Sequence, residues 1–379
     1  MSAPLFSEPL VSAIAEAENL VAAAPHIETE ADLLEGLQYL AGCIAACTHM
    51  VFDYERDHPM LLSGTGPFTK MGLDNPDTLY FGCRVQPDRD YLVTGVRGTT
   101  TDLSFQLLGG EYTDDNVPAS QAAFDDRELE IAADGSFQWQ VRPSSPGQLV
   151  IREVYGDWSA RRGTLSISRL DTAGTAPPPL TRQSIEKRYA TAGKQLVNRI
   201  KTWLQFPQWF YLDIPVNTMV PPRLTPGGLA TQYSSVGHFD LRPDQALVIT
   251  IPASDAPYLG FQLGSLWYIS LDYINHQTSL NNTQAQADPD GKVRIVVADQ
   301  NPGVTNWVET LGHRRGFLQF RWQRVSRQLT DADGPTAELV DFDAIPAKLP
   351  HFEHNKISDD EWQARITLRQ QQIAARMLG

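Results

Sequence analysis

The residues best suited to acid–base chemistry gather in one segment, SLDYINHQTSLNNTQ, at residues 270–284. Histidine titrates near neutral pH, so His276 is a candidate general base, which Asp272 could orient. Tyr273 adds a further hydroxyl group. In the alternative interpretation, the Asn and Ser side chains of this segment only satisfy backbone groups of a loop. The sequence predicts catalytic roles for His276, Tyr273 and Asp272, on a loop held by a rigid scaffold.

A second histidine lies in the segment SSVGHFDL. His238 and Asp240 are two residues apart in a predicted strand, so their side chains point to the same face. Together with His276 they would provide two histidines and one carboxylate, a set that suits non-haem iron. A metal-dependent oxygenase is therefore a third hypothesis. Because a cupin-type ligand pattern is not present, we predict no metal site and no organic cofactor, and we assign His238 to substrate binding.

Several other polar and aromatic side chains could line a binding pocket. In NPDTLY, Pro76 restricts Asn75 to an extended conformation. Trp307 could form a hydrophobic wall of the pocket or a plug at the end of a sandwich. Arg321 follows a strand pattern, where it either faces solvent or binds an anion. The predicted substrate-binding residues are Asn75, Asp77, Tyr80, His238, Asn282, Asn306, Trp307 and Arg321.

The composition excludes several classes of function. With 379 residues the chain can form a large core, and its eight Trp and 15 Phe exclude intrinsic disorder. A formal net charge of −14 argues against nucleic acid or an anionic membrane surface as a partner. Cys43, Cys47 and Cys83 lack the spacing of a disulfide framework, which indicates reduced, buried thiols. Because neither a signal peptide nor a run of ~18 apolar residues is found, we expect a cytoplasmic protein, with homo-oligomerisation left open.

Helical patterns occur at both ends and in the middle of the chain. Thr29 with Asp32 and Ser358 with Glu361 indicate capping boxes, and Ser184 is the expected cap of the central helix. The predicted helices cover 8–24, 30–55, 184–206 and 359–377, and a proline-rich linker covers 172–180.

Short strands with regular turn signals fill the intervening segments, as is typical of a sandwich or barrel. The chain lacks βαβ alternation and a glycine-rich turn between strand and helix, so a Rossmann or P-loop fold is not indicated. It also lacks the GxSxG pattern of a serine nucleophile.

The second half of the chain repeats the first after a shift of 156 residues, since 243 minus 87, 262 minus 106 and 291 minus 135 are each 156. The LSFQL strand at 103–107 falls on LGFQL at 259–263, and the Asp-Gly turn at 134–135 falls on that at 290–291. Asp-Gly suits a type I′ hairpin, in which both central residues have positive φ. The second copy adds VTNWVETLGHRRG before its closing strand. We therefore predict two related β units.

The segments NPDTLYFGCRV and FQL, followed by DPDGKVRIVVADQNPGVTNWVETLGHRRGFLQFRW, resemble proteins with the uncharacterised domains DUF1254 and DUF1214. The resemblance covers roughly 74–170 and 230–325, and its most specific motif is PGxxNW before a glycine-led aromatic strand. It implies a jelly-roll β-sandwich and no particular reaction. The usual Asn-Arg-Tyr-Ser run is replaced here by Tyr273, Ile274, Asn275 and His276.

These observations predict a mainly β protein of two related, jelly-roll-like β-sandwich units with connecting and terminal α-helices. The leading hypothesis for its function is an enzyme, of lyase, isomerase or hydrolase type, acting on a small and largely apolar molecule in an aromatic-lined pocket. The alternative is a non-catalytic sandwich that binds a small molecule or carbohydrate. The expected parts are N-terminal helices (1–58), a first β unit (59–172), a linker and helix (173–206), a second β unit (207–345) and a C-terminal helix (346–379).

Overall fold

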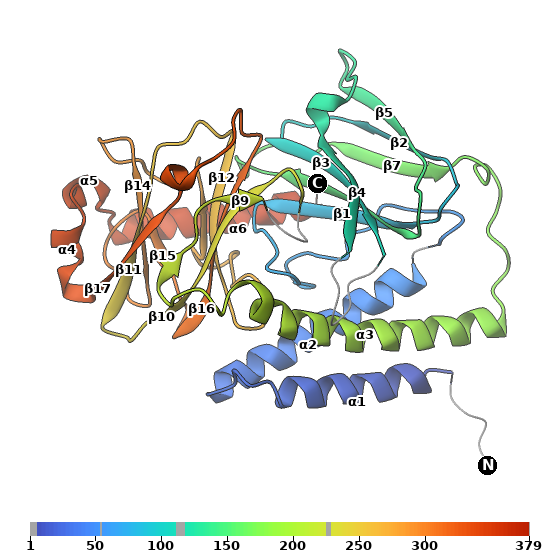
Figure 1. Ribbon diagram of the computed structural model, residues 1–379, viewed down its shortest axis with the longest axis horizontal. Helices are drawn as coiled ribbons and strands as arrows, with labels where there is room; N and C mark the ends of the chain where they lie inside the picture. Colours follow the sequence, from blue (N-terminus) through green and yellow to red (C-terminus); the bar gives the residue numbers. More distant parts are fainter. Residues whose placement is uncertain (1–5, 54, 111–117, 225–228, 379) are drawn as a thin grey trace.

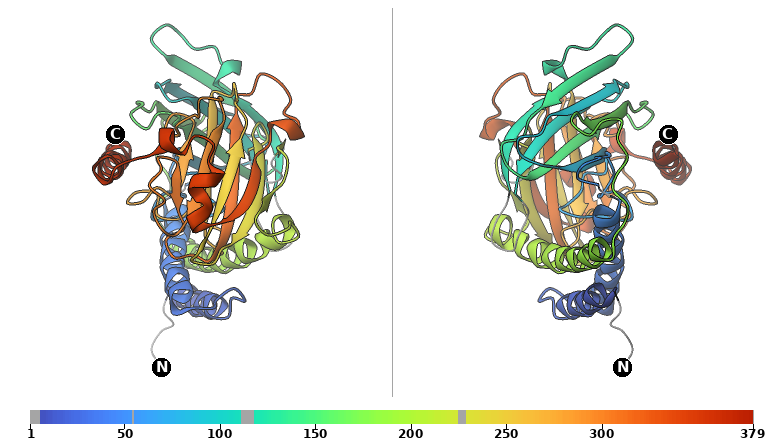
Figure 2. Two further views of the ribbon diagram at one scale, coloured as in Figure 1. Left: turned by 90° about the vertical axis from the view of Figure 1, so that its left-hand side faces the viewer. Right: turned by 90° about the vertical axis from the view of Figure 1, so that its right-hand side faces the viewer.

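Two β units lie side by side, and three long helices pack together along one side of both (Figure 1, Figure 2). The structure, a computed structural model, describes residues 6–53, 55–110, 118–224 and 229–378. The predicted fold class is confirmed, because most elements are strands of antiparallel sheets. The longer helices are α1 (Glu8–Ala22), α2 (Glu30–Phe52), α3 (Arg182–Phe210) and α6 (Asp359–Leu378), and short helices α4 (Ile345–Lys348) and α5 (Phe352–Asn355) precede α6.

The first unit is a sandwich of two antiparallel sheets, with strand orders β1-β6-β3-β4 and β5-β2-β7. Alternate side chains of each strand point inward, and aromatic rings fill the space between the sheets. Phe105 lies at the centre of this core, with its ring 5.1 Å from Phe124 and 5.6 Å from Trp139. The strands are β1 (Thr78–Val85), β2 (Tyr91–Val96), β3 (Asp102–Gly109), β4 (Ala119–Asp125), β5 (Ser136–Val141), β6 (Gly147–Val154) and β7 (Thr164–Arg169).

The second unit is a larger sandwich of the same kind. Its sheets have the orders β13-β12-β16-β10-β8, with β9 also paired to β10, and β15-β14-β11-β17. Ile249, Val297 and Phe320 are among the buried residues of its core. The strands are β8 (Thr218–Met219), β9 (Arg223–Leu224), β10 (Tyr233–Asp240), β11 (Gln245–Ile251), β12 (Tyr258–Gly264), β13 (Ser279–Asn281), β14 (Val293–Ala298), β15 (Trp307–Glu309), β16 (Arg315–Gln323) and β17 (Thr336–Asp341).

The predicted duplication is confirmed by the pairing register of the strands. In the first unit Ser104 pairs with Arg152, and in the second Gly260, 156 residues further on, pairs with Arg321. The two arginines are 169 residues apart because the second unit carries the thirteen extra residues VTNWVETLGHRRG. These extra residues contain β15, which pairs in parallel with β14 at a sheet edge. The two sandwiches are therefore copies of one unit, and Arg152 and Arg321 occupy equivalent positions.

Some local predictions require correction. Only the glycine of each Asp-Gly turn has positive φ, 85° at Gly135 and 79° at Gly291, so the turns are not type I′. Thr181, and not Ser184, is the N-cap of α3, since its side chain accepts from the Ser184 amide. The helix also continues through Pro207 and ends at Phe210. Strand β4 was not predicted because its sequence, ASQAAFD, lacks the apolar–polar alternation of a half-buried strand.

The capping boxes predicted for α2 and α6 are present, since Thr29 and Asp32 exchange hydrogen bonds, as do Ser358 and Glu361. Small residues of α2 allow the second β unit to approach closely. A Cβ atom at Gly36 would lie 2.2 Å from the Trp267 ring, so only glycine fits at this contact. No helix among the described residues is both long and apolar enough to cross a membrane.

Candidate functional site

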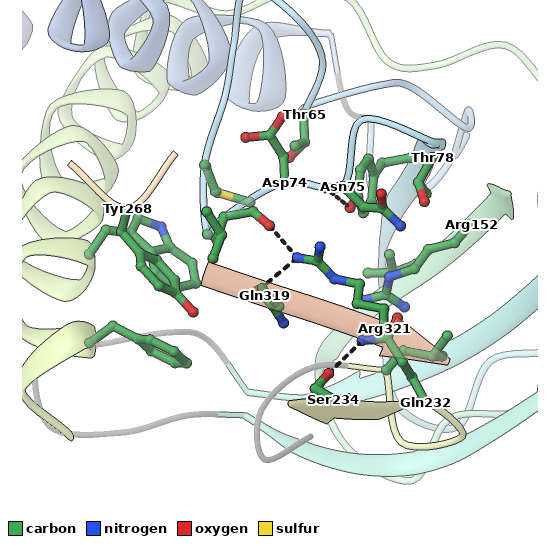
Figure 3. Close-up of a pocket in the computed structure, with 18 of the residues that line it drawn as sticks. Thr65, Asp74, Asn75, Thr78, Arg152, Gln232, Ser234, Tyr268, Gln319 and Arg321 are labelled. Carbon is green, nitrogen blue, oxygen red and sulfur yellow. Dashed lines mark hydrogen bonds between the residues drawn. The ribbon is translucent and has the colours of Figure 1, made fainter. Parts of the chain in front are cut away.

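A cavity of about 210 Å³ lies between the two β units and beside the end of α3 (Figure 3). Strands β1 and β6 of the first unit and β10 and β16 of the second form its walls, together with the loop that precedes β1. Arg152 lies on β6 and Arg321 on β16, which is the equivalent strand of the second unit. Both residues line the cavity, so the cavity lies where the duplicated units meet. Its aromatic lining residues are Tyr80, Phe81, Trp203, Phe206, Phe210, Tyr211 and Tyr268.

The apolar wall is a cluster of rings at the C-terminal end of α3. Trp203 stacks on Tyr268 with ring centroids 5.7 Å apart, and Phe206 lies 5.0 Å from the same tyrosine. The Tyr268 hydroxyl donates to that of Tyr211 at 3.2 Å. Burial raises the pKa of Tyr211 to about 12, so this hydroxyl stays protonated at neutral pH. Gly72, with φ +65°, lies against Trp203, where a Cβ atom would be 2.9 Å from the ring.

The polar wall is centred on Arg321, which is 7% exposed. Its guanidinium donates to Gln262 Oε1, to the Leu73 carbonyl at 2.5 Å and to Gln319 Oε1 at 2.9 Å. All three acceptors are neutral. Among the described residues, no carboxylate lies within 4.0 Å of this guanidinium. Arg321 is therefore a buried cation that forms no ion pair with a described residue, although it acts on the Asp74 carboxyl from further away and lowers the pKa of that group.

Arg152 lines the cavity from the first unit, and Figure 3 shows it across from Tyr268, with Arg321 between them. Its Nη1 donates to Gln106 Oε1 at 2.9 Å, and its guanidinium lies 6.0 Å from the Tyr80 ring. The same Gln–Arg pairing occurs between Gln262 and Arg321. Both members of the pair are thus retained in each repeat.

Asp74 is a carboxylate on the cavity wall, 3% exposed. It accepts from the Ser270 amide at 3.1 Å and from the Ser270 hydroxyl at 2.8 Å. Burial raises the pKa of Asp74, although Lys70, Ser270 and Arg321 act in the opposite direction. The Asp74 carboxyl is therefore more easily protonated than an exposed one.

Asp77 connects the two units and holds the loop beside the cavity. It accepts from Trp158 Nε1 of the first unit at 2.5 Å. From the second unit, the Tyr258 hydroxyl donates to it at 2.7 Å and Asn281 Nδ2 at 3.0 Å. Asn75 Nδ2 also donates to the Tyr258 hydroxyl at 2.8 Å. The predicted residue Asp77 thus positions the loop, whereas Asn75, Tyr80 and Arg321 line the cavity itself.

The predicted catalytic residues are placed elsewhere. Asp272 accepts from the amides of Ile274 and Asn275, so it closes a turn and does not orient the histidine. Tyr273 is 3% exposed, and burial raises its pKa. His276 Nδ1 donates to Glu309 Oε2 at 2.9 Å, and the histidine side chain is 43% exposed. None of the three predicted catalytic residues is among the residues that line the cavity.

The remaining predicted residues have structural contacts of their own. His238 Nε2 lies 2.6 Å from the Ile214 carbonyl, and Asp240 forms an ion pair with Arg314 at 2.9 Å. Asn282 accepts from the Leu259 amide, and Asn306 accepts from the Gln286 amide. Trp307 donates to the Ala298 carbonyl and stacks on Trp362, with centroids 4.8 Å apart. These four predicted residues, His238, Asn282, Asn306 and Trp307, lie outside the cavity lining.

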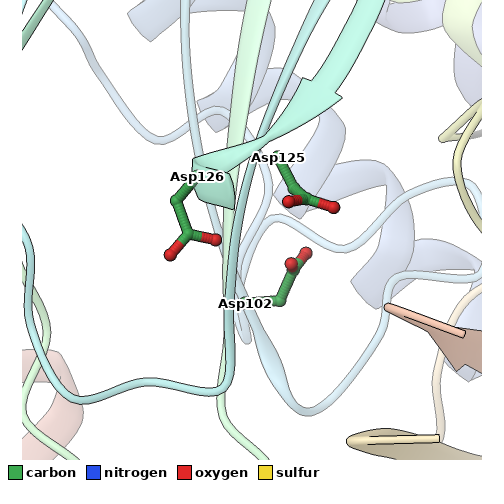
Figure 4. A group of neighbouring side chains, drawn as sticks. All are labelled: Asp102, Asp125 and Asp126. Carbon is green, nitrogen blue, oxygen red and sulfur yellow. The ribbon is translucent and has the colours of Figure 1, made fainter. Parts of the chain in front are cut away.

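Acidic side chains do gather at another place, between the start of β3 and the end of β4 (Figure 4). One oxygen from each of Asp102, Asp125 and Asp126 lies within 4.8 Å of the others. Arg324 of the second unit pairs with Asp102 at 3.2 Å and also contacts Asp126. Further arginines, Arg97 and Arg127, pair with Asp126 and Asp125. Within the described part of the chain, these three aspartates are the group whose geometry could hold a metal, and His238, Asp240 and His276 do not form such a group. Because Arg324 comes from the second unit and pairs with aspartates of the first, the cluster is an ionic contact between the units.

Sequence reasoning did not assign Asp74, Gln319 or the α3 aromatic residues to a site. The apolar stripe of α3 indicated only a packed helix, because periodicity does not distinguish a core from a cavity wall. The repeat itself did contain a signal, since the FQL motif supplies a glutamine at the same place in both copies.

The fold and the cavity define a protein of two repeated β-sandwich units with a pocket between them. No protein-family model matches the chain, and no curated protein matches it. Among solved structures, an uncharacterised protein from Burkholderia cenocepacia is 26% identical, with a TM-score of 0.80 over 90% of this chain and 98% of its own. A protein from Vibrio parahaemolyticus is 11% identical, with a TM-score of 0.41 over 86% of this chain and 99% of its own. The first of these similarities shows that the two-unit architecture also occurs in the Burkholderia protein.

Proposed function

We propose that the protein binds a small, largely apolar organic molecule in the cavity between its two β units. The observation that carries this proposal is the ring cluster of Trp203, Phe206 and Tyr268 on one wall, facing polar groups on the other. Ligand sites are typically concave, lined by aromatic residues and equipped with a few polar groups that orient the ligand. They also occur preferentially where domains meet.

Binding without catalysis is the function that this arrangement supports best. A general base must come within hydrogen-bond reach of its substrate. His276 pairs with Glu309 outside the cavity lining, and the described residues that line the cavity include no histidine. The hypothesis of histidine-dependent catalysis therefore has no support from the cavity.

The test is a direct measurement of binding with neutral, apolar probes, 1-octanol and 3-phenyl-1-propanol. Val236 on β10 lines the cavity and is 6% exposed, so Val236→Phe should fill it and abolish binding. Leu339→Phe is the matched control, since Leu339 is 43% exposed on β17. A probe present at a hundred times its Kd should stabilise the wild type by about 2.7 kcal/mol. Equal binding to the wild type and Val236→Phe would place the ligand elsewhere.

A second candidate function is acid–base catalysis by Asp74. Burial raises the pKa of Asp74, and a carboxyl tuned in this way in a pocket is typical of a general acid. The test is turnover of a bound molecule, followed by mass spectrometry, in the wild type and in Asp74→Asn. Turnover that depends on Asp74 would support an enzyme, and persistent binding of unchanged ligand would support a binding protein.

We also propose that the chain is a divergent relative of the DUF1254 and DUF1214 proteins, because it carries the PGxxNW motif and two sandwich units. We also propose a cytoplasmic location, because Cys43, Cys47 and Cys83 are free and buried. Fractionation of the host cell, with detection of the native protein, tests this location.

A further inference from the structure

Resting on the proposed function, we infer that the ligand of the inter-unit cavity carries a carboxylate, and that Arg321 is the group that binds it. The ligand class is then a small monocarboxylic acid with an apolar aliphatic or aromatic body.

A buried cation that forms no ion pair is costly, because it has lost its hydration and gains only partial compensation from the more distant Asp74 carboxyl, whose own pKa burial raises. Arg321 is 7% exposed and is held by two glutamine side chains and one backbone carbonyl. These neutral acceptors orient the guanidinium but do not compensate its charge. A carboxylate ligand would do so, and the cavity gives it access.

Arg321 keeps N–H donors that a ligand carboxylate can use. A guanidinium has five N–H donors, and three are engaged by Gln262, Gln319 and the Leu73 carbonyl. Two donors remain, on Nε and Nη1, because Leu73 and Gln319 engage both hydrogens of Nη2. They do not share an edge of the guanidinium, so a carboxylate would accept from one of them through a single charge-assisted hydrogen bond.

The other charged residues of the lining favour an anion as well. The charged side chains that line the cavity, among the described residues, are Asp74, Arg152, Arg223 and Arg321. Arginines outnumber carboxyls among these described residues, although the whole chain carries a net charge of −14. Arg152 makes a further interaction of its own, so Arg321, the buried one, is the arginine that this wall offers to an anion.

The apolar part of the ligand has its place on the opposite wall. Figure 3 shows Tyr268 on the far side of Arg321 from Arg152, and Tyr268 belongs to the ring cluster with Trp203 and Phe206. A molecule anchored at Arg321 can therefore extend its hydrocarbon part over these rings. Burial of that part would supply most of the affinity, and the carboxylate would supply orientation and specificity.

The test compares matched acids and alcohols, octanoate with 1-octanol and 3-phenylpropionate with 3-phenyl-1-propanol, by isothermal titration calorimetry on the full chain. We expect each acid to bind the wild type more tightly than its alcohol by roughly tenfold to hundredfold, the range of hydrogen bonds to a charged group. In Arg321→Gln this preference, measured as the ratio of acid to alcohol affinity within that variant, should disappear, whatever happens to the absolute affinity for the alcohols. Arg314→Gln, which removes the same charge from a residue 62% exposed, is the matched control and should keep the preference.

The outcomes separate the two proposals. Equal affinity of the wild type for acids and alcohols would refute the carboxylate anchor and leave the proposed binding function intact. Binding of neither class would refute both. If Arg321→Gln fails to fold, the acid–alcohol comparison on the wild type and on Arg152→Gln still decides: a preference that persists in Arg152→Gln supports Arg321 as the anchor, and a preference that is absent from the wild type or lost in Arg152→Gln overturns it.

Discussion

Replacement of Asp77 by alanine is expected to destabilise the protein strongly, because this carboxylate connects the two β units. Asp77 is 2% exposed and accepts hydrogen bonds from Trp158, Tyr258 and Asn281. Alanine would remove the acceptor of all three buried donors, and each lost hydrogen bond to the carboxylate costs about 1–3 kcal/mol. Trp158 loses its acceptor, whereas the Tyr258 hydroxyl and Asn281 keep weaker contacts with Asn75 Oδ1 at 3.1 Å and the Tyr155 carbonyl at 3.4 Å. Since neighbouring effects are not additive, we expect a total loss of roughly 3–6 kcal/mol in the free energy of unfolding.

The assay is urea denaturation at equilibrium, followed by tryptophan fluorescence and by circular dichroism. Two probes are needed because a chain with two units can unfold in more than one step. Asp244→Ala is the control, since the Asp244 side chain is 67% exposed and pairs only with Arg242; a surface change of this kind should stay within about 0.5 kcal/mol. A loss below about 1 kcal/mol for Asp77→Ala would refute the role of Asp77 as the link between the units.

Three further predictions concern other residues. Gly72→Ala should cost about 1–3 kcal/mol of stability and weaken ligand binding, because φ is +65° and the new Cβ would lie 2.9 Å from the Trp203 ring. Chemical denaturation measures the loss of stability, and calorimetry measures the loss of binding. Unchanged values would contradict the proposed wall contact. His276→Ala should leave ligand binding unchanged and cost at most about 1 kcal/mol, since its contact with Glu309 is half-exposed; a loss of binding would return His276 to the site. Folding raises the pKa of Asp102 to about 6. Burial and the nearby Asp125 and Asp126 raise this pKa, whereas Arg324 lowers it. Protonation of Asp102 therefore stabilises the folded state below the unfolded pKa near 3.9, and this contribution is lost as the pH rises through about 6. Asp102→Asn should flatten the fall in stability between about pH 4 and pH 7, and an unchanged pH profile of thermal unfolding would refute the assignment.

The predicted catalytic residues His276, Tyr273 and Asp272 do not line the cavity, and the difference has a physical cause. The segment 270–284 is rich in polar side chains, a pattern that predicts catalytic groups. In the structure, many of them satisfy backbone and side-chain groups at the junction of strands and α6: Gln277 contacts Arg365, and Arg369 donates to Ser279 and to the Tyr273 carbonyl. Such density of hydrogen-bonding groups marks an interface between elements as readily as it marks an active site.

What the sequence determined by itself was the repeat and the fold class. The shift of 156 residues was visible because duplicated strands retain their turns and their inward-facing residues, which are local properties of the chain. The capping boxes of α2 and α6 could be predicted for the same reason. The tertiary structure alone decided which residues share a cavity. Asp74, Trp203 and Arg321 are far apart in the chain and meet only when the two copies pack against each other beside α3. Whether an arginine in a strand faces solvent, a carboxylate or a cavity depends on the partner surface, and a single sequence does not record that partner.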